Sequence, residues 1–344
     1  MRSTMCLRTR AILSITAVLT AFSTVSSAQI ALPPGCTVTP STIGTGRDIC
    51  QKAAELFAFV VPQVGVALAG GNAMPGEGGT LGGWGKRAVS LRLVAVDGRL
   101  PRNSVPLSIT APNSVTSDFG AVRTFIPTPA VDLGVGFIKG LPVGVTNVGG
   151  VDLLLGVTVI PKVSQRAMHI SQRERDVAFS YGVRVGALQE SAFVPGLSAT
   201  FVRRRLPALD FDYTPNDDTL QLRGTVVTSN SLRVMASKRI VLFGLAAGVG
   251  RDEIVATTGL GATVNDATAP VGQRRAVIAL PSLTEKVRRS TAFVNASLGL
   301  IVARIVGEFG WSSAGTVRET VNTFGGRKAN EGYRYGSIGI TTRF

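Results

Sequence analysis

Hydrophobic and polar residues alternate with a period of two along most of this chain, from Gly65 to its last residue. Such alternation is typical of a β-strand with one apolar and one polar face. Turn-forming residues such as Asp97-Gly98 separate the clearest runs, which are 88–96, 179–188, 220–226 and 294–302. Runs of about ten residues suit a transmembrane strand, whose backbone amides must all pair inside lipid. We therefore predict an all-β fold, a transmembrane antiparallel β-barrel of about 12–14 strands, over residues 63–344.

A soluble β-sandwich is the alternative fold, because its inner and outer faces alternate in the same way. The 40 glycines favour the barrel. Glycine weakens a soluble sheet, whereas barrel strands use it where they bend or where luminal side chains must be small. The strand faces opposite the long aliphatic residues carry Gly, Ser, Thr and Arg, which suits a polar lumen.

Helical spacing replaces the alternation in residues 47–59, and Pro62 is expected to end this helix. We assign residues 29–62 to an N-terminal leader with a short helix. In a barrel the helix would either plug the lumen or lie at the periplasmic end, and a helix packed on a soluble sheet would show the same pattern. One face of the predicted helix carries Ile49, Ala53, Leu56 and Phe57.

The first 28 residues have the layout of a secretory signal peptide. Arginines precede an apolar run from Ala11 to Val25, and a small-residue site for cleavage after Ala28 follows. A membrane-spanning helix is the alternative, but it normally needs about 20 predominantly apolar residues, and this run is shorter and contains Ser and Thr. We predict export and cleavage after Ala28.

Two cysteines, Cys36 and Cys50, remain after removal of the signal peptide. An even number of cysteines in an exported chain indicates a disulfide, here one that closes a short loop. The only histidine, His169, is far away in sequence, so the residues predict neither a metal site nor a cofactor.

The formal net charge of +15 suggests a nucleic-acid binder, but the arginines are scattered singly through apolar stretches. A phosphate-binding groove concentrates its positive charge on one face, often beside stacking aromatic residues. We therefore expect no nucleic-acid partner, and an electropositive lumen or surface instead.

Four arginines lie between apolar neighbours on predicted strands: Arg92, Arg184, Arg223 and Arg343. They are expected to point into the lumen, because an arginine facing lipid near the membrane centre costs about 2–4 kcal/mol. They could then pair with luminal carboxylates such as Asp152 or Glu308 and hold the barrel shut. Alternatively, they could line a path for an anionic solute, including one with an apolar tail.

Other charged and aromatic residues are expected at the membrane surface. The clusters Arg203-Arg204-Arg205 and Arg288-Arg289 are predicted to contact lipid headgroups. Trp84, Tyr181, Trp311, Tyr333 and Tyr335 are predicted to lie in interfacial belts.

Catalytic motifs are lacking in the sequence. His169 and Ser171 are similar to the catalytic pair of outer-membrane phospholipases, but the polar residues around them indicate a solvated loop, and no motif supplies a third residue. No nucleophile-elbow motif occurs. We expect no enzymatic activity.

The last residues, 332–344, form an alternating run that ends on an aromatic residue. Ser337, Gly339 and Phe344 match the pattern that resembles the C-terminal recognition sequence of bacterial outer-membrane β-barrels. The resemblance implies a strand recognised by the barrel-assembly machinery, with Phe344 facing lipid and Arg343 facing inward.

Several Gly-rich stretches together resemble a family of uncharacterised bacterial outer-membrane β-barrel proteins, related in general shape to the long-chain fatty-acid transporters: 83–96, 140–145, 194–198 and 237–250. The resemblance implies an outer-membrane location, lipid contacts and an N-terminal segment inside the barrel. No ligand residue of the transporters matches here. The resulting hypothesis is passive uptake or binding of a small hydrophobic, amphipathic or anionic solute. The alternative is a non-transporting structural or adhesive barrel that acts through loops 165–176 and 312–330.

Overall fold

A computed structural model describes residues 37–39, 47–101, 107, 116–160, 163–165, 168–172, 176–214, 218–265, 270–272 and 274–344. The predicted signal peptide, its cleavage site after Ala28, Cys36 and most of the leader lie outside these residues. All described residues belong to one compact unit, Leu32–Phe344.

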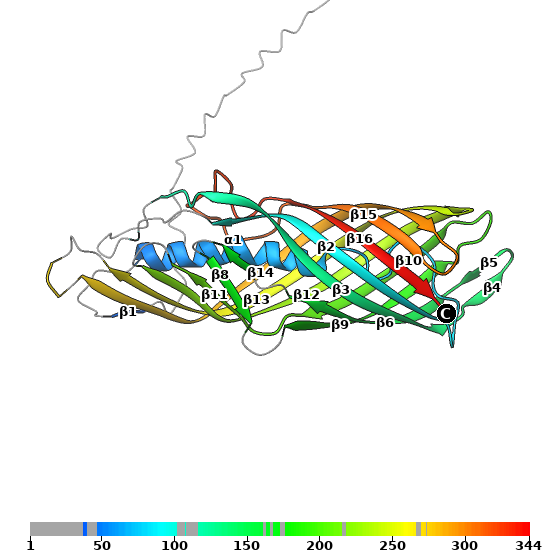
Figure 1. Cartoon of the computed structure of the whole chain (residues 1–344), viewed down its shortest axis with the longest axis horizontal. Helices are drawn as coiled ribbons and strands as arrows, with labels where there is room; N and C mark the ends of the chain where they lie inside the picture. Colours follow the sequence, from blue (N-terminus) through cyan, green and yellow to red (C-terminus); the bar gives the residue numbers. More distant parts are fainter. Residues whose placement is uncertain are drawn as a thin grey trace, which may run out of the picture. The chain divides into compact units, whose positions relative to one another are not determined.

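Ten strands form a closed antiparallel barrel (Figure 1). The ring closes because the last strand pairs with the first, with Tyr335 opposite Val96 and Arg343 opposite Ala88. The strands of the ring are, in order, β2 (Arg87–Pro101), β3 (Ala121–Ile138), β6 (Gly150–Val159), β9 (Val177–Leu188), β10 (Gly196–Arg205), β12 (Thr219–Ile240), β13 (Phe243–Asn265), β14 (Arg275–Gly299), β15 (Arg304–Ser312) and β16 (Tyr333–Arg343).

Shorter strands extend the sheet outside the ring. β11 pairs with β12 and β8, β7 pairs with β8, and β1 pairs with β14. A separate hairpin joins β4 to β5. These strands are β1 (Thr37–Thr39), β4 (Leu141–Val143), β5 (Thr146–Val148), β7 (Val163–Gln165), β8 (Met168–Gln172) and β11 (Leu209–Tyr213).

The barrel is confirmed, but the predicted 12–14 strands are too many, because the ring has ten. Two features explain the difference. β12, β13 and β14 are 22, 23 and 25 residues long, so each contains more than one transmembrane-length alternating run. In addition, β7, β8 and β11 alternate like barrel strands but pair beside the ring.

The two ends of the barrel differ. At one end, which we call the base, the ring strands are joined by short turns such as Val241-Leu242 and 300–303, and the C-terminus lies there (Figure 1). At the other end, the head, longer segments such as 102–120 and 313–332 connect the strands. On β12, residues 219–229 belong to the head and residues 230–240 to the base.

One helix, α1 (Arg47–Ala69), lies inside the barrel near the head (Figure 1). It contacts β2, β3, β12, β13, β14 and β16. By length and composition alone it could cross a membrane, but 94% of its most apolar stretch is buried within the barrel. Most of its side chains are apolar, and a helix with so much apolar surface requires such an enclosed position.

Contrary to the prediction from the sequence, the helix does not end at Pro62. It continues to Ala69. An interior proline removes one backbone hydrogen bond and costs about 3 kcal/mol. The surrounding barrel core outweighs this cost. The helix ends where Gly71 adopts a positive φ of 75°, a conformation that glycine accepts without strain.

Candidate functional site

The lumen is the candidate site, because the predicted arginines, the helix and the most deeply buried charges meet there. Residues 70–83 continue from the end of α1 toward the base and are almost all buried inside the barrel. Leu81 N–H lies 3.0 Å from both carboxylate oxygens of Asp152, and Thr80 Oγ1 lies 2.9 Å from Gln189 Oε1. The N-terminal chain thus enters the barrel from the head and leaves it at the base, where β2 begins.

Arg184 is buried in the lumen and bound to Asp152. Its Nε and Nη2 atoms donate to Asp152 Oδ2 at 2.9 and 2.7 Å, and both side chains are almost fully buried. The two residues are directly opposite on β9 and β6. Because the same carboxylate accepts Leu81 N–H, this ion pair ties the threaded segment to the wall.

Arg92 and Arg233 hold the C-terminal end of α1. Arg92 donates to Asp132 Oδ2 at 2.5 Å and to the Gly70 carbonyl at 2.9 Å. Arg233 donates to the Ala69 carbonyl at 2.6 Å and lies 3.9 Å from Asp252. Positive side chains stabilise the unpaired carbonyls at the C-terminus of a helix, so these contacts fix where α1 stops.

Arg343 lies on the inward face of β16, at the base. It forms an ion pair with the buried Glu77 of the threaded segment. Arg304 donates to the same carboxylate at 3.2 Å. Two arginines from the wall therefore bind Glu77 at the base.

Arg223 is not in the lumen, contrary to the prediction. Its side chain lies on the outer face of β12, 38% exposed, and contacts Asp212 at 2.7 Å and Asp210 at 3.6 Å. The neighbouring Leu220 and Leu222 point inward and belong to the apolar core of the head. The error arose from assuming that apolar neighbours lie on the outer face, which holds only near the base.

The arginine clusters also divide between the two faces. Arg203, Arg205 and Arg288 are exposed on the outside. Arg204 and Arg289, predicted at the membrane surface, are instead almost fully buried and face the interior. Arg289 donates to the carbonyls of Ser313 and Glu331, at 2.6 and 2.7 Å.

Head loops cover the upper part of α1. Glu55 of the helix accepts the N–H groups of Val321 and Asn322 at 3.0 and 2.9 Å. Phe59 stacks on Phe324, with ring centroids 4.1 Å apart. These contacts join the helix to the segment between β15 and β16.

Asp118 joins the same cover from the segment that precedes β3. Its carboxylate accepts Thr323 Oγ1–H at 2.9 Å and Gly326 N–H at 3.2 Å. The hydrogen bond from Thr323 is the main reason that the pKa of Asp118 lies below its usual value.

A small apolar cavity lies between α1 and the wall of the head. Its free volume is about 40 Å³, whereas sites for drug-sized ligands usually measure about 300–1,000 Å³. It is lined by Val64, Ala67, Leu68, Ile126, Thr128, Thr158, Ile160, Ile170, Leu206, Leu209 and Phe211. A hydrophobic solute of ordinary size does not fit without a movement of α1.

The outer face of the base half carries a continuous band of exposed apolar side chains, which we call the apolar band. Ile338, Ile340 and Phe344 of the last strand belong to it, while Gly339 faces inward and Ser337 is partly buried. Tyr181 and Trp311 lie on this face and Trp84 is exposed near the base, but Tyr333 and Tyr335 are buried in the interior and not in a belt. Further members are Leu91, Leu93, Val131, Leu153, Leu155, Val185, Leu232, Val234, Leu245, Val249, Val294 and Phe309.

The remaining sequence-predicted residues can be placed in part. Cys50 is buried and disulfide-bonded; its pairing with Cys36, which lies outside the described residues, stays a prediction. His169 and Ser171 are exposed on β8, and Asp212 lies opposite His169 on β11. Arg223 binds Asp212. His169, Ser171 and Asp212 therefore lie together on a solvated strand face. Within the described ranges no cluster of His, Cys, Asp and Glu could hold a metal ion.

No protein-family model matches the chain, and a search of curated proteins gives no match. Solved structures do resemble it. The translocator domain of the autotransporter NalP from Neisseria meningitidis is 10% identical, with 86% of this chain and 98% of that chain covered and a TM-score of 0.36. A Pseudomonas aeruginosa FadL homologue is 10% identical, with 81% and 96% covered and a TM-score of 0.21.

The toluene transporter TodX of P. putida is also 10% identical, with 81% of this chain and 92% of that chain covered and a TM-score of 0.24. A FadL homologue and other outer-membrane proteins are thus among the matches. At these identities and TM-scores the matches assign neither a family nor an activity. The barrel itself rests on its strand pairing.

Proposed function

We propose that this protein is an outer-membrane β-barrel whose base half spans the membrane and whose head projects from it. The apolar band supports this placement, because lipid-facing side chains must be apolar. Strand length supports it too: β13 has 23 residues, whereas a transmembrane strand needs about 9–11. The outer face of the head carries charged residues such as Lys286 and Arg288, which suit water.

The orientation follows from the connections. Outer-membrane barrels have short turns on the periplasmic side and longer loops outside. The base, with its short turns and the C-terminus, is therefore assigned to the periplasm. The head and the N-terminal end of α1 are assigned to the cell exterior. The apolar residues on the outer face of β16, ending at Phe344, are placed against lipid, as expected for an assembly signal.

We further propose that the barrel does not conduct solutes and acts as a membrane anchor for its head. The observation that carries this is the burial of α1 and residues 70–83 inside the barrel, along a path from the head to the base. Three luminal arginines, Arg92, Arg184 and Arg233, bind carboxylates or backbone carbonyls, so these three do not present free positive charge to an anionic solute. Of the two functions considered from the sequence, the structural or adhesive barrel fits better than the uptake barrel.

Conductance across a planar lipid bilayer tests this proposal. The intact protein should show no steady ion current. A variant lacking residues 47–82 should conduct, because the barrel wall remains while its filling is removed. Arg223→Ala, which alters only the outer face, is the matched control and should leave the intact protein closed. A steady current through the intact protein that decreases in Arg184→Ala would overturn the proposal in favour of solute uptake.

A further inference from the structure

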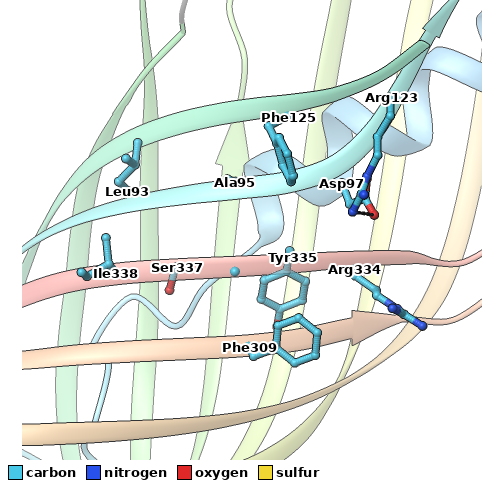
Figure 2. A pocket seen from close by; sticks show the side chains of 11 residues that line it. Leu93, Ala95, Asp97, Arg123, Phe125, Phe309, Arg334, Tyr335, Ser337 and Ile338 are labelled. Atoms are coloured by element: carbon cyan, nitrogen blue, oxygen red, sulfur yellow. Dashed lines mark hydrogen bonds and ion pairs between the residues drawn. The ribbon is translucent and has the colours of Figure 1, made fainter. Parts of the chain in front are cut away.

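A groove lies on the outer surface where the apolar band meets the charged outer face of the head. It runs across β3, β2, β16 and β15 and has a volume of about 460 Å³ (Figure 2). We call it the outer groove. Its apolar part is lined by Leu93, Ala95, Phe125, Phe309, Gly336 and Ile338.

Small residues make the floor of the outer groove and aromatic residues make its sides. Ala95 and Gly336 are directly opposite on β2 and β16. Phe125 of β3 and Phe309 of β15 flank them (Figure 2). A Cβ atom added at Gly336 would have its nearest neighbour, the Glu308 carbonyl oxygen, 3.8 Å away, so the space above this glycine is open. The shape suits a flexible hydrocarbon chain.

Charged residues mark only one end of the outer groove, the end toward the head. Arg123 and Arg334 lie there, together with Asp97 (Figure 2). Arg123 donates to both carboxylate oxygens of Asp97, at 2.6 and 2.8 Å. Within the part of the chain that the structure describes, Arg334 has no carboxylate partner. Two guanidinium groups and one carboxylate leave a net positive charge at this end.

The guanidinium of Arg123 is also held in place by an aromatic ring. Its Cζ atom lies 5.4 Å from the centroid of the Phe125 ring, within the range of a cation–π contact. A pre-positioned guanidinium loses less conformational freedom when it binds an oxyanion. The charged end is thus arranged to bind an anion next to the point where the apolar part begins.

We propose that the outer groove binds a membrane lipid with a phosphate headgroup, its phosphate at Arg334 and Arg123 and one acyl chain between Phe125 and Phe309. Charge complementarity supports this occupant, because guanidinium groups bind phosphate oxygens strongly. The position supports it as well: an acyl chain along the apolar band lies at hydrocarbon depth, and the arginines lie at headgroup depth. The inference rests on the membrane placement proposed above, but not on the closed lumen.

The fluorescence of Trp311 provides a local readout. Its ring packs against that of Phe309, with centroids 4.7 Å apart. Brominated acyl chains in the groove would therefore quench it, and Trp84→Phe removes the other tryptophan. The detergent-solubilised full-length protein is titrated with brominated phosphatidic acid and with brominated diacylglycerol of the same chains. We expect phosphatidic acid to bind about tenfold more tightly, since charged hydrogen bonds form only with the phosphate.

Variants separate specific binding from diffuse surface charge. Arg334→Ala should abolish most of the preference for phosphatidic acid, whereas Arg203→Ala, which removes an exposed arginine elsewhere on the outer face, should leave it unchanged. Gly336→Leu should weaken the binding of both lipids by filling the groove, while Ala247→Leu, on the outer face of β13, should not. Asp97→Asn should strengthen phosphatidic acid binding, because it releases Arg123.

Several outcomes would overturn the proposal. Equal losses in Arg334→Ala and Arg203→Ala would show a general effect of surface charge. Binding of inorganic phosphate as tight as that of phosphatidic acid would show an anion site to which the acyl chain contributes nothing. Equal binding of the two brominated lipids would show an ordinary lipid-facing surface. Because conductance is not measured, this proposal and the closed-lumen proposal can fail independently.

Discussion

The base half and the head half of this barrel use the same strands with opposite polarity. On β12, Leu232 and Val234 point outward near the base, while Arg233 points inward. Further along the same strand, Leu220 and Leu222 point inward and Arg223 points outward. The base half is polar inside and apolar outside, and the head half is the reverse. The same two-residue alternation thus serves a wall that is apolar on its outer face and a wall that is polar on its outer face.

The contents of the lumen change at the same level as its walls. In the head, apolar α1 packs against apolar residues such as Ile254 and Ile278. In the base, the threaded segment is held by ion pairs and hydrogen bonds. Arg92 and Arg233 stand at the transition, where they bind the last carbonyls of the helix. The end of α1 therefore coincides with the change in wall polarity.

The largest loss of stability is expected when a buried charge in the base half loses its ion-pair partner. Asp152→Ala leaves Arg184 without its partner and Leu81 N–H without an acceptor. We expect the free energy of unfolding to fall by about 3–5 kcal/mol, measured by urea-induced unfolding in lipid vesicles. The double variant Asp152→Leu/Arg184→Met should lose much less, because no charge stays buried alone. Equal losses in both would contradict the role of this ion pair.

In the head half, the corresponding loss of stability is expected from a substitution that removes a buried apolar side chain. Ile254 is fully buried, and Gly65 of α1 lies so close that an added Cβ would be 2.6 Å from its Cδ1 atom. Ile254→Ala should leave a cavity between helix and wall and cost about 2–5 kcal/mol in unfolding free energy. Val249→Ala, in the apolar band on the outer face of the same strand, is the control and should cost clearly less.

Arginine scanning along the outer face of β12 tests the inversion directly. Val234→Arg puts a charge in the apolar band and should destabilise the protein by about 2–4 kcal/mol in vesicles. Thr228→Arg, on the same face of the head, should change stability little, because its guanidinium stays in water. Equal effects at the two positions would show that the band does not mark the membrane.

The smallest effect is expected at the cover of the head. The pKa of Asp118 is lowered mainly by its hydrogen bond with Thr323. A carboxylate with a lowered pKa in the folded state stabilises that state at neutral pH, and the stabilisation is lost as the pH falls through this pKa. Amide hydrogen exchange at Gly326 should therefore accelerate, relative to its intrinsic rate, on acidification below about pH 4. Asp118→Asn should remove this pH dependence.

The sequence predicts the architecture better than the interior. Alternation identifies a barrel strand wherever its two faces meet different environments, one polar and one apolar. The helical spacing of apolar residues in 47–59 identifies the helix. Alternation does not say which face is inside, so Arg223 was placed wrongly. The prediction for Tyr333 and Tyr335 is wrong because tyrosines near strand ends are typical of interfacial belts. Both lie an even number of residues from Arg343 on β16, so they share its inward face.

The luminal contacts were predictable only in part. The sequence leaves two roles open for the luminal arginines, pairing with carboxylates such as Asp152 or lining a path for an anionic solute. Arg184 forms an ion pair with Asp152. The partnership of Arg92 with Asp132 depends on strand register, and that of Arg233 with Ala69 joins residues 164 positions apart. No local pattern encodes such contacts. The continuous apolar composition of the sequence on both sides of Pro62 is the one feature that indicates a helix extending to Ala69.

The threaded segment has a consequence for the order of assembly. The ring is sealed by the pairing of β16 with β2, the last and first strands of the ring, across most of the chain length. Contacts so distant in sequence form late, because their loop-closure entropy is large. A helix covered by loops at the head and anchored by arginines at its end is difficult to insert into a finished cylinder. We therefore expect α1 to be surrounded by the strands while the seam between β16 and β2 is still open.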